Sequence, residues 1–187
     1  MDKLKVAVIG TGAMGRSHAR IYSEMGNIEL VAVCDKDEKV ASEIAKKYNT
    51  KPFTDYKQID ANLDAVSVCV PTKLHKDVAL FFINKGINVI VEKPIASSME
   101  EAKILIKAAK KNNVKLMVGH VERFNPVIAE IKKRIENNEL GKIYSIITFR
   151  FSPFPHRVID VGVTTDLAVH DIDIVMYLNN SKIKRIY

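Results

Sequence analysis

The segment TTDLAVHDID, residues 164–173, places a carboxylate and an imidazole four residues apart, at Asp166 and His170. In a helix this spacing puts both side chains on one face. The pair can bind a metal or transfer a proton, because an imidazole with a pKa near neutrality suits acid–base chemistry. It can also be structural, with Thr165 capping a helix and Asp166 favouring its dipole. Asp173 lies nearby, but no third convergent ligand is evident, so we expect no metal.

A glycine-rich motif near the N-terminus indicates a dinucleotide. VIGTGAMG follows an apolar run and opens a helical pattern, with Gly10, Gly12 and Gly15 in the spacing G-x-G-x-x-G. The first glycine permits a tight turn, the second lets a diphosphate approach the backbone, and the third lets helix and strand pack closely. The helix N-terminus then faces the negative charge. We expect the whole loop to contact the cofactor: Gly10, Thr11, Gly12, Ala13, Met14 and Gly15.

A carboxylate at the end of the next apolar run makes this prediction more specific. Asp35 lies twenty residues after Gly15. An acidic residue at this place binds the 2′-hydroxyl of the adenosine ribose and repels a 2′-phosphate. The combination favours NAD as the cofactor, while Lys36 beside it keeps NADP open as the alternative.

Two further motifs follow apolar runs that we expect to end at the same edge of a sheet. In VPTKLH, Pro71, Thr72 and His75 are expected beside the cofactor, because ligands of parallel sheets bind at the carboxyl ends of the strands. Alternatively, Thr72 caps the next helix and His75 lies on the surface. In VEKP, Glu92 binds the cofactor or holds Lys93, and Lys93 can hydrogen-bond a substrate hydroxyl and transfer a proton. The alternative is a charged pair at a strand end.

The motif GHVERFNP follows the last of these apolar runs. It brings Arg123 to the same edge, where we expect it to contact the substrate. Asn125 directly precedes Pro126, and this pair is typical of a helix N-cap with proline in the first helical position. For Asn125 the structural role is therefore the one we expect.

Short β-branched runs alternate with helical patterns through the first 120 residues. The expected strands lie in 3–10, 29–35, 65–71, 88–94 and 114–119. The expected helices end near residues 25, 48, 85 and 112, and the third begins near residue 76. This alternation is typical of an α/β fold, a doubly wound parallel sheet with helices on both faces, the Rossmann arrangement. We expect this dinucleotide-binding domain to span residues 1–121.

The pattern changes after Asn125. A helix over 126–138 is followed by alternation typical of a strand over 142–151, a proline-rich loop, the helix with His170, and a strand-like end over 182–187. These elements are too few to close a second sheet. We expect residues 122–187 to form an incomplete α+β domain that serves the substrate site and oligomerisation.

The composition is that of a globular protein, with 47% hydrophobic and 27% charged residues among 187. The net charge is +7, but Lys and Arg alternate with Glu along the helical patterns, so we expect no nucleic-acid surface. There is no apolar run of about 18 residues and no signal-peptide pattern, which predicts a cytoplasmic protein without membrane association. Cys34 and Cys69 lie in apolar runs and are expected to be buried thiols.

Taken in order, GTGAMG, Asp35, PTKLH, EKP, RFNP and DLAVHDID resemble the motifs of the Gfo/Idh/MocA oxidoreductases, the family of glucose–fructose oxidoreductase and inositol dehydrogenase. The resemblance covers nearly the whole chain, and EKP with DLAVHDID is its most specific part. It implies that Lys93 and His170 are catalytic, that Asp166 lies in the substrate site, and that the nicotinamide lies beside EKP. His170 then acts as general base on a substrate hydroxyl while a hydride leaves to the nicotinamide.

The segment over 149–173 resembles one branch of the family, the UDP-N-acetylglucosamine 3-dehydrogenases. Arg150, His156 and Arg157 surround its proline-rich loop, where guanidinium groups can bind a diphosphate. Exposed arginines on an edge strand are the alternative. The leading hypothesis is oxidation at C3 of UDP-N-acetylglucosamine. The alternatives are an inositol, polyol or other sugar dehydrogenase, and a non-catalytic dinucleotide-binding fragment.

Members of this family are considerably longer than the present chain, which implies a truncated second domain. A partial sheet with exposed apolar strands tends to associate. We therefore expect a homo-oligomer, a dimer or larger.

Overall fold

The computed structural model describes residues 2–59, 62–151, 162 and 167–186. The chain forms two compact units, unit 1 over Met1–Gly119 and unit 2 over His120–Tyr187. Among the helices of the described part, none combines the length and the apolar composition needed to cross a membrane.

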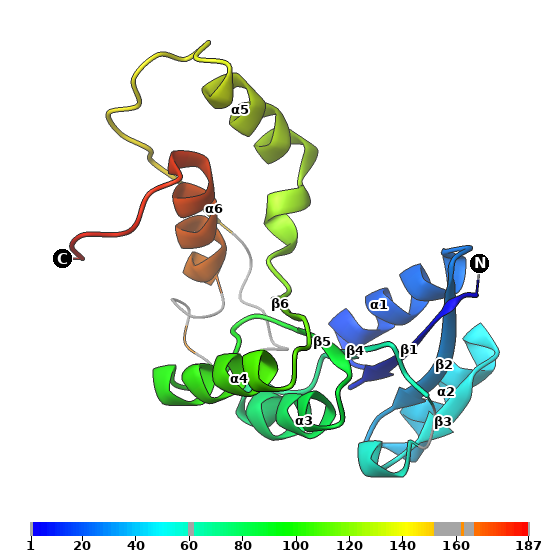
Figure 1. Cartoon of the computed structure of the whole chain (residues 1–187). Helices are drawn as coiled ribbons and strands as arrows, with labels where there is room; N and C mark the ends of the chain where they lie inside the picture. Colours follow the sequence, from blue (N-terminus) through cyan, green and yellow to red (C-terminus); the bar gives the residue numbers. More distant parts are fainter. Residues whose placement is uncertain (1, 60–61, 152–161, 163–166, 187) are drawn as a thin grey trace. The chain divides into compact units, whose positions relative to one another are not determined.

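Unit 1 is built on a six-stranded parallel sheet (Figure 1). The strands are β1 (Leu4–Ile9), β2 (Ile28–Cys34), β3 (Lys51–Phe53), β4 (Ala65–Val68), β5 (Asn88–Val91) and β6 (Leu116–Val118). Their order in the sheet is β3-β2-β1-β4-β5-β6. The chain therefore proceeds outward from β1 to one edge and then from β4 to the other. Ligands of such sheets bind at this reversal, outside the carboxyl ends of β1 and β4.

Helices cover both faces of the sheet, as the sequence predicted. They are α1 (Ala13–Glu24), α2 (Glu38–Tyr48), α3 (Thr72–Asn84) and α4 (Met99–Lys111), with a short 3₁₀ turn η1 (Tyr56–Gln58). The helices α1 and α2 pack on one face in a cluster around Ile44, and α3 and α4 pack on the other around Phe82 and Leu105. Within β1, Val8 belongs to the first cluster and Ile9 to the second. The alternation of side chains along a strand requires this division.

Two details differ from the prediction. The third helix begins at Thr72 rather than near Lys76, with Pro71 in the N-cap position. The strand β3 was missed because it is three residues long and contains Pro52. A proline weakens a strand pattern, but β3 is at the edge of the sheet, where a missing N–H donor is tolerated.

The two cysteines are both free thiols. Cys34 is buried, as predicted, and Cys69 is partly buried. Burial raises the pKa of Cys34 to about 12 and also raises that of Cys69. Both side chains therefore stay protonated near neutral pH.

Unit 2 contains the 3₁₀ turn η2 (Val121–Phe124) and the helices α5 (Pro126–Glu136) and α6 (Val169–Asn179). Asn125 starts α5 as predicted, because its side chain accepts a hydrogen bond from the Val127 N–H at 3.1 Å and Pro126 follows in the first turn. In α6, Ile174 and Leu178 are buried.

The strands predicted over 142–151 and 182–187 are wrong for this structure. Residues 142–151 and 182–186 form no strand, and the described residues of unit 2 contain none. Strand backbone needs a neighbour for its N–H and C=O groups, so an alternating pattern alone is insufficient. Four large side chains of the first segment are instead 74–90% exposed: Tyr144, Ile147, Phe149 and Phe151. The described part of unit 2 therefore contains helices and no sheet, which agrees with an incomplete second domain.

Candidate active site

Five segments leave the sheet of unit 1 at its carboxyl edge, and they carry most of the residues that the sequence singled out. Gly10 follows β1, Asp35 follows β2, Cys69 follows β4, Glu92 follows β5 and Gly119 follows β6. Four of these residues donate backbone hydrogen bonds of 2.7–2.9 Å to the ends of neighbouring strands. The edge is therefore fixed by the sheet itself.

The glycine-rich loop is shaped by close contacts. Gly10 has a φ of +86°, and a Cβ at this position would lie 2.7 Å from the carbonyl carbon and oxygen of Cys69. A Cβ on Gly15 would lie 1.8 Å from the carbonyl oxygen of Gly10. At Gly12, by contrast, a Cβ would meet no atom of the described part within 4 Å. Gly12 is the N-cap of α1 and supplies no side-chain cap, so the helix N–H groups can bind an anionic diphosphate.

The Asp35 carboxylate is held by the same loop. Its Oδ2 accepts hydrogen bonds from the backbone N–H and the hydroxyl of Thr11, at 2.8 and 3.1 Å. Its Oδ1 accepts one from the Asp37 N–H at 3.1 Å. Thr11 is fully buried, whereas Ala13 is exposed and Met14 partly exposed. A fixed negative charge therefore lies beside the open end of α1.

In the VPTKLH segment, the alternative of a surface position for His75 is wrong. This side chain is 1% exposed. Its Nδ1 lies 2.8 Å from the Pro94 carbonyl oxygen, and its Nε2 lies 2.8 Å from that of Val70. Both ring nitrogens are therefore engaged inside the protein, and His75 connects two loops; its contact with a cofactor stays a prediction. Pro71 and Thr72 remain at the edge, with Thr72 largely buried as the first residue of α3.

Glu92 faces a hydrogen-bonded cluster that the sequence reasoning missed. Its Oε1 lies 2.9 Å from Nε2 of His18. The Nδ1 of His18 lies 3.0 Å from the Ser67 hydroxyl, which is 2.7 Å from the hydroxyl of Tyr22. A serine inside the apolar strand β4 was the available signal, because a buried hydroxyl needs a partner.

This cluster also offers atoms that could bind a metal. One atom each of His18, Cys69 and Glu92 lies within 4.8 Å of the others. Both ring nitrogens of His18 are already hydrogen-bonded, however, and burial raises the pKa of the Cys69 thiol. Metal binding requires the thiolate. We therefore interpret the cluster as a hydrogen-bonding network.

Lys93 directly follows Glu92 at the carboxyl edge. It is half-buried, and its peptide bond to Pro94 is cis. Gly119 packs against the neighbouring carboxylate, since a Cβ there would lie 2.9 Å from Oε1 of Glu92. Lys93 thus stands between two residues, Glu92 and Pro94, that are each bound to a histidine.

In unit 2, His170 is partly buried in the first turn of α6. Asp166 and Arg157 lie outside the described residues. The pairing of Asp166 with His170 therefore stays a prediction, and so does the contact of Arg157 with a diphosphate.

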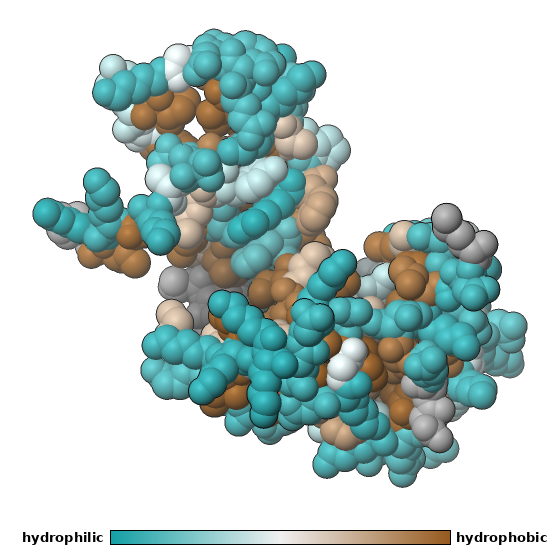
Figure 2. Space-filling view, viewed as in Figure 1, coloured by the Kyte–Doolittle hydropathy of each residue, from teal (hydrophilic) through white to brown (hydrophobic). Residues whose placement is uncertain are grey.

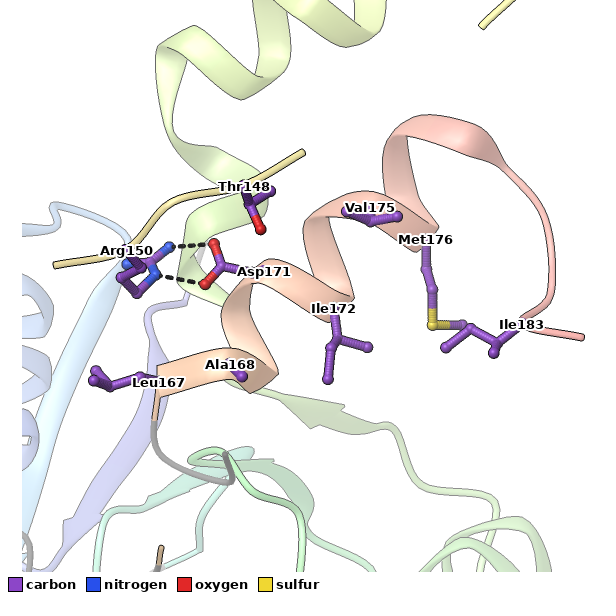
Figure 3. A pocket seen from close by; sticks show the side chains of 9 residues that line it. All are labelled: Thr148, Arg150, Leu167, Ala168, Asp171, Ile172, Val175, Met176 and Ile183. Atoms are coloured by element: carbon purple, nitrogen blue, oxygen red, sulfur yellow. Dashed lines mark hydrogen bonds and ion pairs between the residues drawn. The ribbon is translucent and has the colours of Figure 1, made fainter. Parts of the chain in front are cut away.

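The two other arginines that we expected to contact the substrate are engaged by carboxylates. Arg123 Nε donates to Oδ2 of the largely buried Asp173 at 2.8 Å, and this bond raises the pKa of the guanidinium. Arg150 Nε donates to Oδ2 of Asp171 at 2.9 Å (Figure 3), and Arg150 also lies 3.5 Å from Glu122. A substrate anion would have to compete with these carboxylates.

A groove in unit 2 runs along one side of α6. Arg150 and Asp171 lie at one end, and the apolar side chains of Ile172, Val175 and Met176 line it further along (Figure 3). It therefore combines a charged end with an apolar wall.

These features of the structure define a class of protein. A doubly wound parallel sheet with a glycine-rich turn, an open helix N-terminus and a fixed carboxylate after β2 is typical of a dinucleotide-binding oxidoreductase. The profile of the oxidoreductase family with an NAD-binding Rossmann fold, Gfo/Idh/MocA, matches residues 4–120. The chain belongs to this family.

Individual relatives are dehydrogenases of sugars and polyols. A UDP-N-acetylglucosamine 3-dehydrogenase of Acidithiobacillus ferrooxidans is 31% identical over 97% of this chain and 56% of its own length, and the solved structure of such an enzyme gives a TM-score of 0.86. The scyllo-inositol 2-dehydrogenase (NAD(+)) of Bacillus subtilis is 32% identical over 97% of this chain and 55% of its own.

The WlbA dehydrogenase of Bordetella pertussis, solved with NADH and UDP-GlcNAcA, is 25% identical with a TM-score of 0.82. The match covers 94% of this chain and 58% of that structure. The chain thus spans a little over half the length of the relatives it matches.

Proposed function

We propose that this protein is an NAD-dependent oxidoreductase that oxidises a sugar hydroxyl by hydride transfer. The observation that carries the proposal is the meeting, at one sheet edge, of the open glycine-rich turn, the fixed Asp35 carboxylate and the Glu92–Lys93 pair. The first two suit a dinucleotide and the third supplies an ionisable group beside it. Family membership supports the same reaction class.

The choice of NAD over NADP rests on charge. Asp35 is oriented by three hydrogen bonds, and its carboxylate would accept from a ribose 2′-hydroxyl and repel a 2′-phosphate. Arg16 of α1 is bound to Glu43 of α2 at 3.0 Å, and this hydrogen bond raises the pKa of its guanidinium. A 2′-phosphate would have to draw Arg16 away from Glu43.

In the proposed reaction, bound NAD supplies the acceptor for the hydride. His170 removes the proton from the substrate hydroxyl, since an imidazole can accept a proton near neutral pH. Lys93 donates a hydrogen bond to the oxygen that develops negative charge. Asp166 orients the substrate hydroxyl or the imidazole. Holding donor and acceptor carbons close is the protein's remaining task.

For the substrate, we propose C3 of UDP-N-acetylglucosamine, on the resemblance of 149–173 to that branch and the similarity to the A. ferrooxidans enzyme. Arg150 and Arg157 are the proposed diphosphate contacts, with Arg123 as a further substrate contact. Inositol or another polyol is the second candidate, because an inositol dehydrogenase is similar to the same degree.

The substrate proposal is tested by mixing the protein with NAD and UDP-N-acetylglucosamine and following the absorbance of reduced nicotinamide. Parallel samples contain NADP, or myo-inositol in place of the nucleotide sugar. We expect a rise, as turnover or as a single stoichiometric burst, with NAD and the nucleotide sugar. A rise with myo-inositol alone would transfer the proposal to polyols. If the absorbance rises in no sample although the protein binds NADH, the chain is a cofactor-binding fragment without this activity.

We also propose that residues 122–187 serve the substrate site and assembly, and that the protein forms homo-oligomers in the cytoplasm. Exposed apolar side chains support assembly: Phe149 and Phe151 are 79% and 90% exposed. Figure 2 shows hydrophobic atoms at the surface of the part that holds α5 and α6. Light scattering tests this, with a dimer or larger expected and a monomer contradicting it.

A further inference from the structure

The residues on either side of Lys93 are held by histidines from two different helices. Glu92, before it, is bound by His18 of α1. Pro94, after it, is bound through its carbonyl oxygen by His75 of α3. Neither histidine is adjacent to Lys93 in sequence, and both contacts are 2.8–2.9 Å long. This juxtaposition lies entirely within unit 1.

One assignment of protons satisfies all the hydrogen bonds around His18. The ionised carboxylate of Glu92 can only accept, so Nε2 of His18 donates to it. In a neutral imidazole Nδ1 then accepts, and the Ser67 hydroxyl donates to it. Ser67 in turn accepts from the hydroxyl of Tyr22 at 2.7 Å. Every member of this chain is satisfied, which makes the position of the Glu92 carboxylate well determined.

Glu92 has little freedom to leave this arrangement. Its side chain is 8% exposed, and the backbone of Gly119 lies against its carboxylate on another side. Its own N–H donates to the Val68 carbonyl at 2.9 Å. Moving Glu92 away from His18 would leave a buried carboxylate without this donor, which is unfavourable.

His75 makes the second attachment. Its two partners are carbonyl oxygens of Val70 and Pro94, which only accept. The imidazolium form donates to both, whereas a neutral ring donates to one. At 1% exposure the ring has no room to turn toward solvent. His75 therefore ties the loop after β4 to the turn that contains Lys93.

We propose that His18 and His75 are positioning residues that fix the Lys93 turn from its two sides, through the Glu92 carboxylate and the Pro94 carbonyl. The proposal rests on the role of Lys93 in the proposed function. It also explains why α1, the helix of the glycine-rich turn, is connected to the segment that carries the reactive amine. Cofactor-binding and catalytic elements are thereby held in one geometry.

Four substitutions in the full chain separate the contacts of each ring. A glutamine amide reaches the place of Nε2, and an asparagine amide that of Nδ1. His18→Gln therefore keeps the Glu92 contact and His18→Asn keeps only the Ser67 contact. For His75 the pattern reverses, since His75→Asn keeps the Pro94 contact and His75→Gln keeps only that to Val70. Tyr22→Phe is the matched control, because it removes a hydroxyl from the same series of hydrogen bonds without removing a contact of Glu92.

The first readout is amide hydrogen exchange by ¹⁵N NMR, which does not depend on activity. We expect the Glu92 amide to exchange about tenfold faster in His18→Asn and His75→Gln. It should stay within about twofold of the starting protein in His18→Gln, His75→Asn and Tyr22→Phe, a change that corresponds to a small part of one hydrogen bond. In the active protein, kcat should fall about tenfold or more in the first pair, with the KM for NAD unchanged.

Three results would overturn the proposal. One is equal behaviour of the asparagine and glutamine variants. Another is faster exchange spread evenly over β1 and β2, which indicates general destabilisation. The third is failure of both Gln and Asn variants of either histidine to fold, since one of each pair retains the proposed contact. Failure of the proposed function would give a different result. Lys93→Met would retain full turnover, while the Glu92 amide still exchanged faster in His18→Asn and His75→Gln alone.

Discussion

Two glycines of the same loop should respond to alanine in opposite ways. At Gly10 the φ of +86° disfavours any residue with a Cβ, at roughly 1–2 kcal/mol. The new atom would also lie 2.7 Å from the Cys69 backbone, which cannot rotate away, and such overpacking adds about 1–3 kcal/mol. The sum of about 2–5 kcal/mol lowers Tm by about 4–20 °C in a chain of this size.

At Gly12 the same methyl group meets no described atom within 4 Å, and φ is −65°. We expect Gly12→Ala to shift Tm by less than about 4 °C, the change that corresponds to about 1 kcal/mol for a less favourable N-cap. Because the methyl would occupy the space where a diphosphate approaches α1, NADH binding should weaken. Losing one charge-assisted hydrogen bond, about 1.5–3 kcal/mol, raises Kd about 10- to 150-fold.

The assay combines thermal unfolding by circular dichroism with titration of NADH fluorescence on the same samples. Gly10→Ala and Gly12→Ala are compared in Tm and in NADH affinity, and each variant serves as the control for the other. Unchanged NADH affinity in a folded Gly12→Ala variant would refute the assignment of this space to the cofactor. An unchanged Tm in Gly10→Ala would refute the steric account of the turn.

Three other predictions concern charge and burial. Asp35→Asn should narrow the preference for NAD over NADP about tenfold or more, since it removes one charge that repels a 2′-phosphate; equal selectivity before and after, measured as a ratio of Kd values, would count against the cofactor assignment. Arg123→Met should lower the free energy of unfolding by about 1–2 kcal/mol. This loss is smaller than for a fully buried ion pair, because the Arg123 side chain is 43% exposed. Urea unfolding measures this, with Arg134→Met, at an exposed pair, as the control that should leave the midpoint in place. The pKa of Cys34 is raised from 9.0 to about 12, so the folded state favours the thiol. The contribution of this thiol to the free energy of unfolding should be complete below pH 9 and be lost as the pH rises toward 12. Rapid alkylation of Cys34 in the folded protein at pH 8 would contradict its burial.

The sheet was predictable because its signals are local and strong. Strands β1, β2 and β5 are apolar runs followed directly by Gly10, Asp35 and Glu92, and the apolar run that contains β4 ends at Pro71. Helix α4 has Ser98 as N-cap and ends at Asn112, as expected. The side chain of Ser98 accepts from the Glu101 N–H at 3.2 Å. Such boundaries depend on neighbours in sequence, so a single sequence reveals them.

Features that depend on distant partners were missed. The burial of His75 was missed because it depends on contacts such as that with Pro94, nineteen residues away. His18 bonds with Ser67 and Glu92 across even longer separations. The segment over 142–151 has the alternation of a strand without a pairing partner in the described part of unit 2. The sequence pattern specifies which face of a strand is apolar, whereas strand pairing requires a neighbouring strand.

Transfer of the hydride from C3 is the central claim, and one isotope experiment tests it most directly. The protein is mixed with NAD and UDP-N-acetylglucosamine that carries deuterium at C3, and the nicotinamide product is analysed by mass spectrometry, with Lys93→Met in parallel. We predict that deuterium appears in the reduced nicotinamide with the starting protein and that its transfer is strongly reduced in the variant. Deuterium that stays in the sugar, in a sample where NADH binding is demonstrated, would contradict the account.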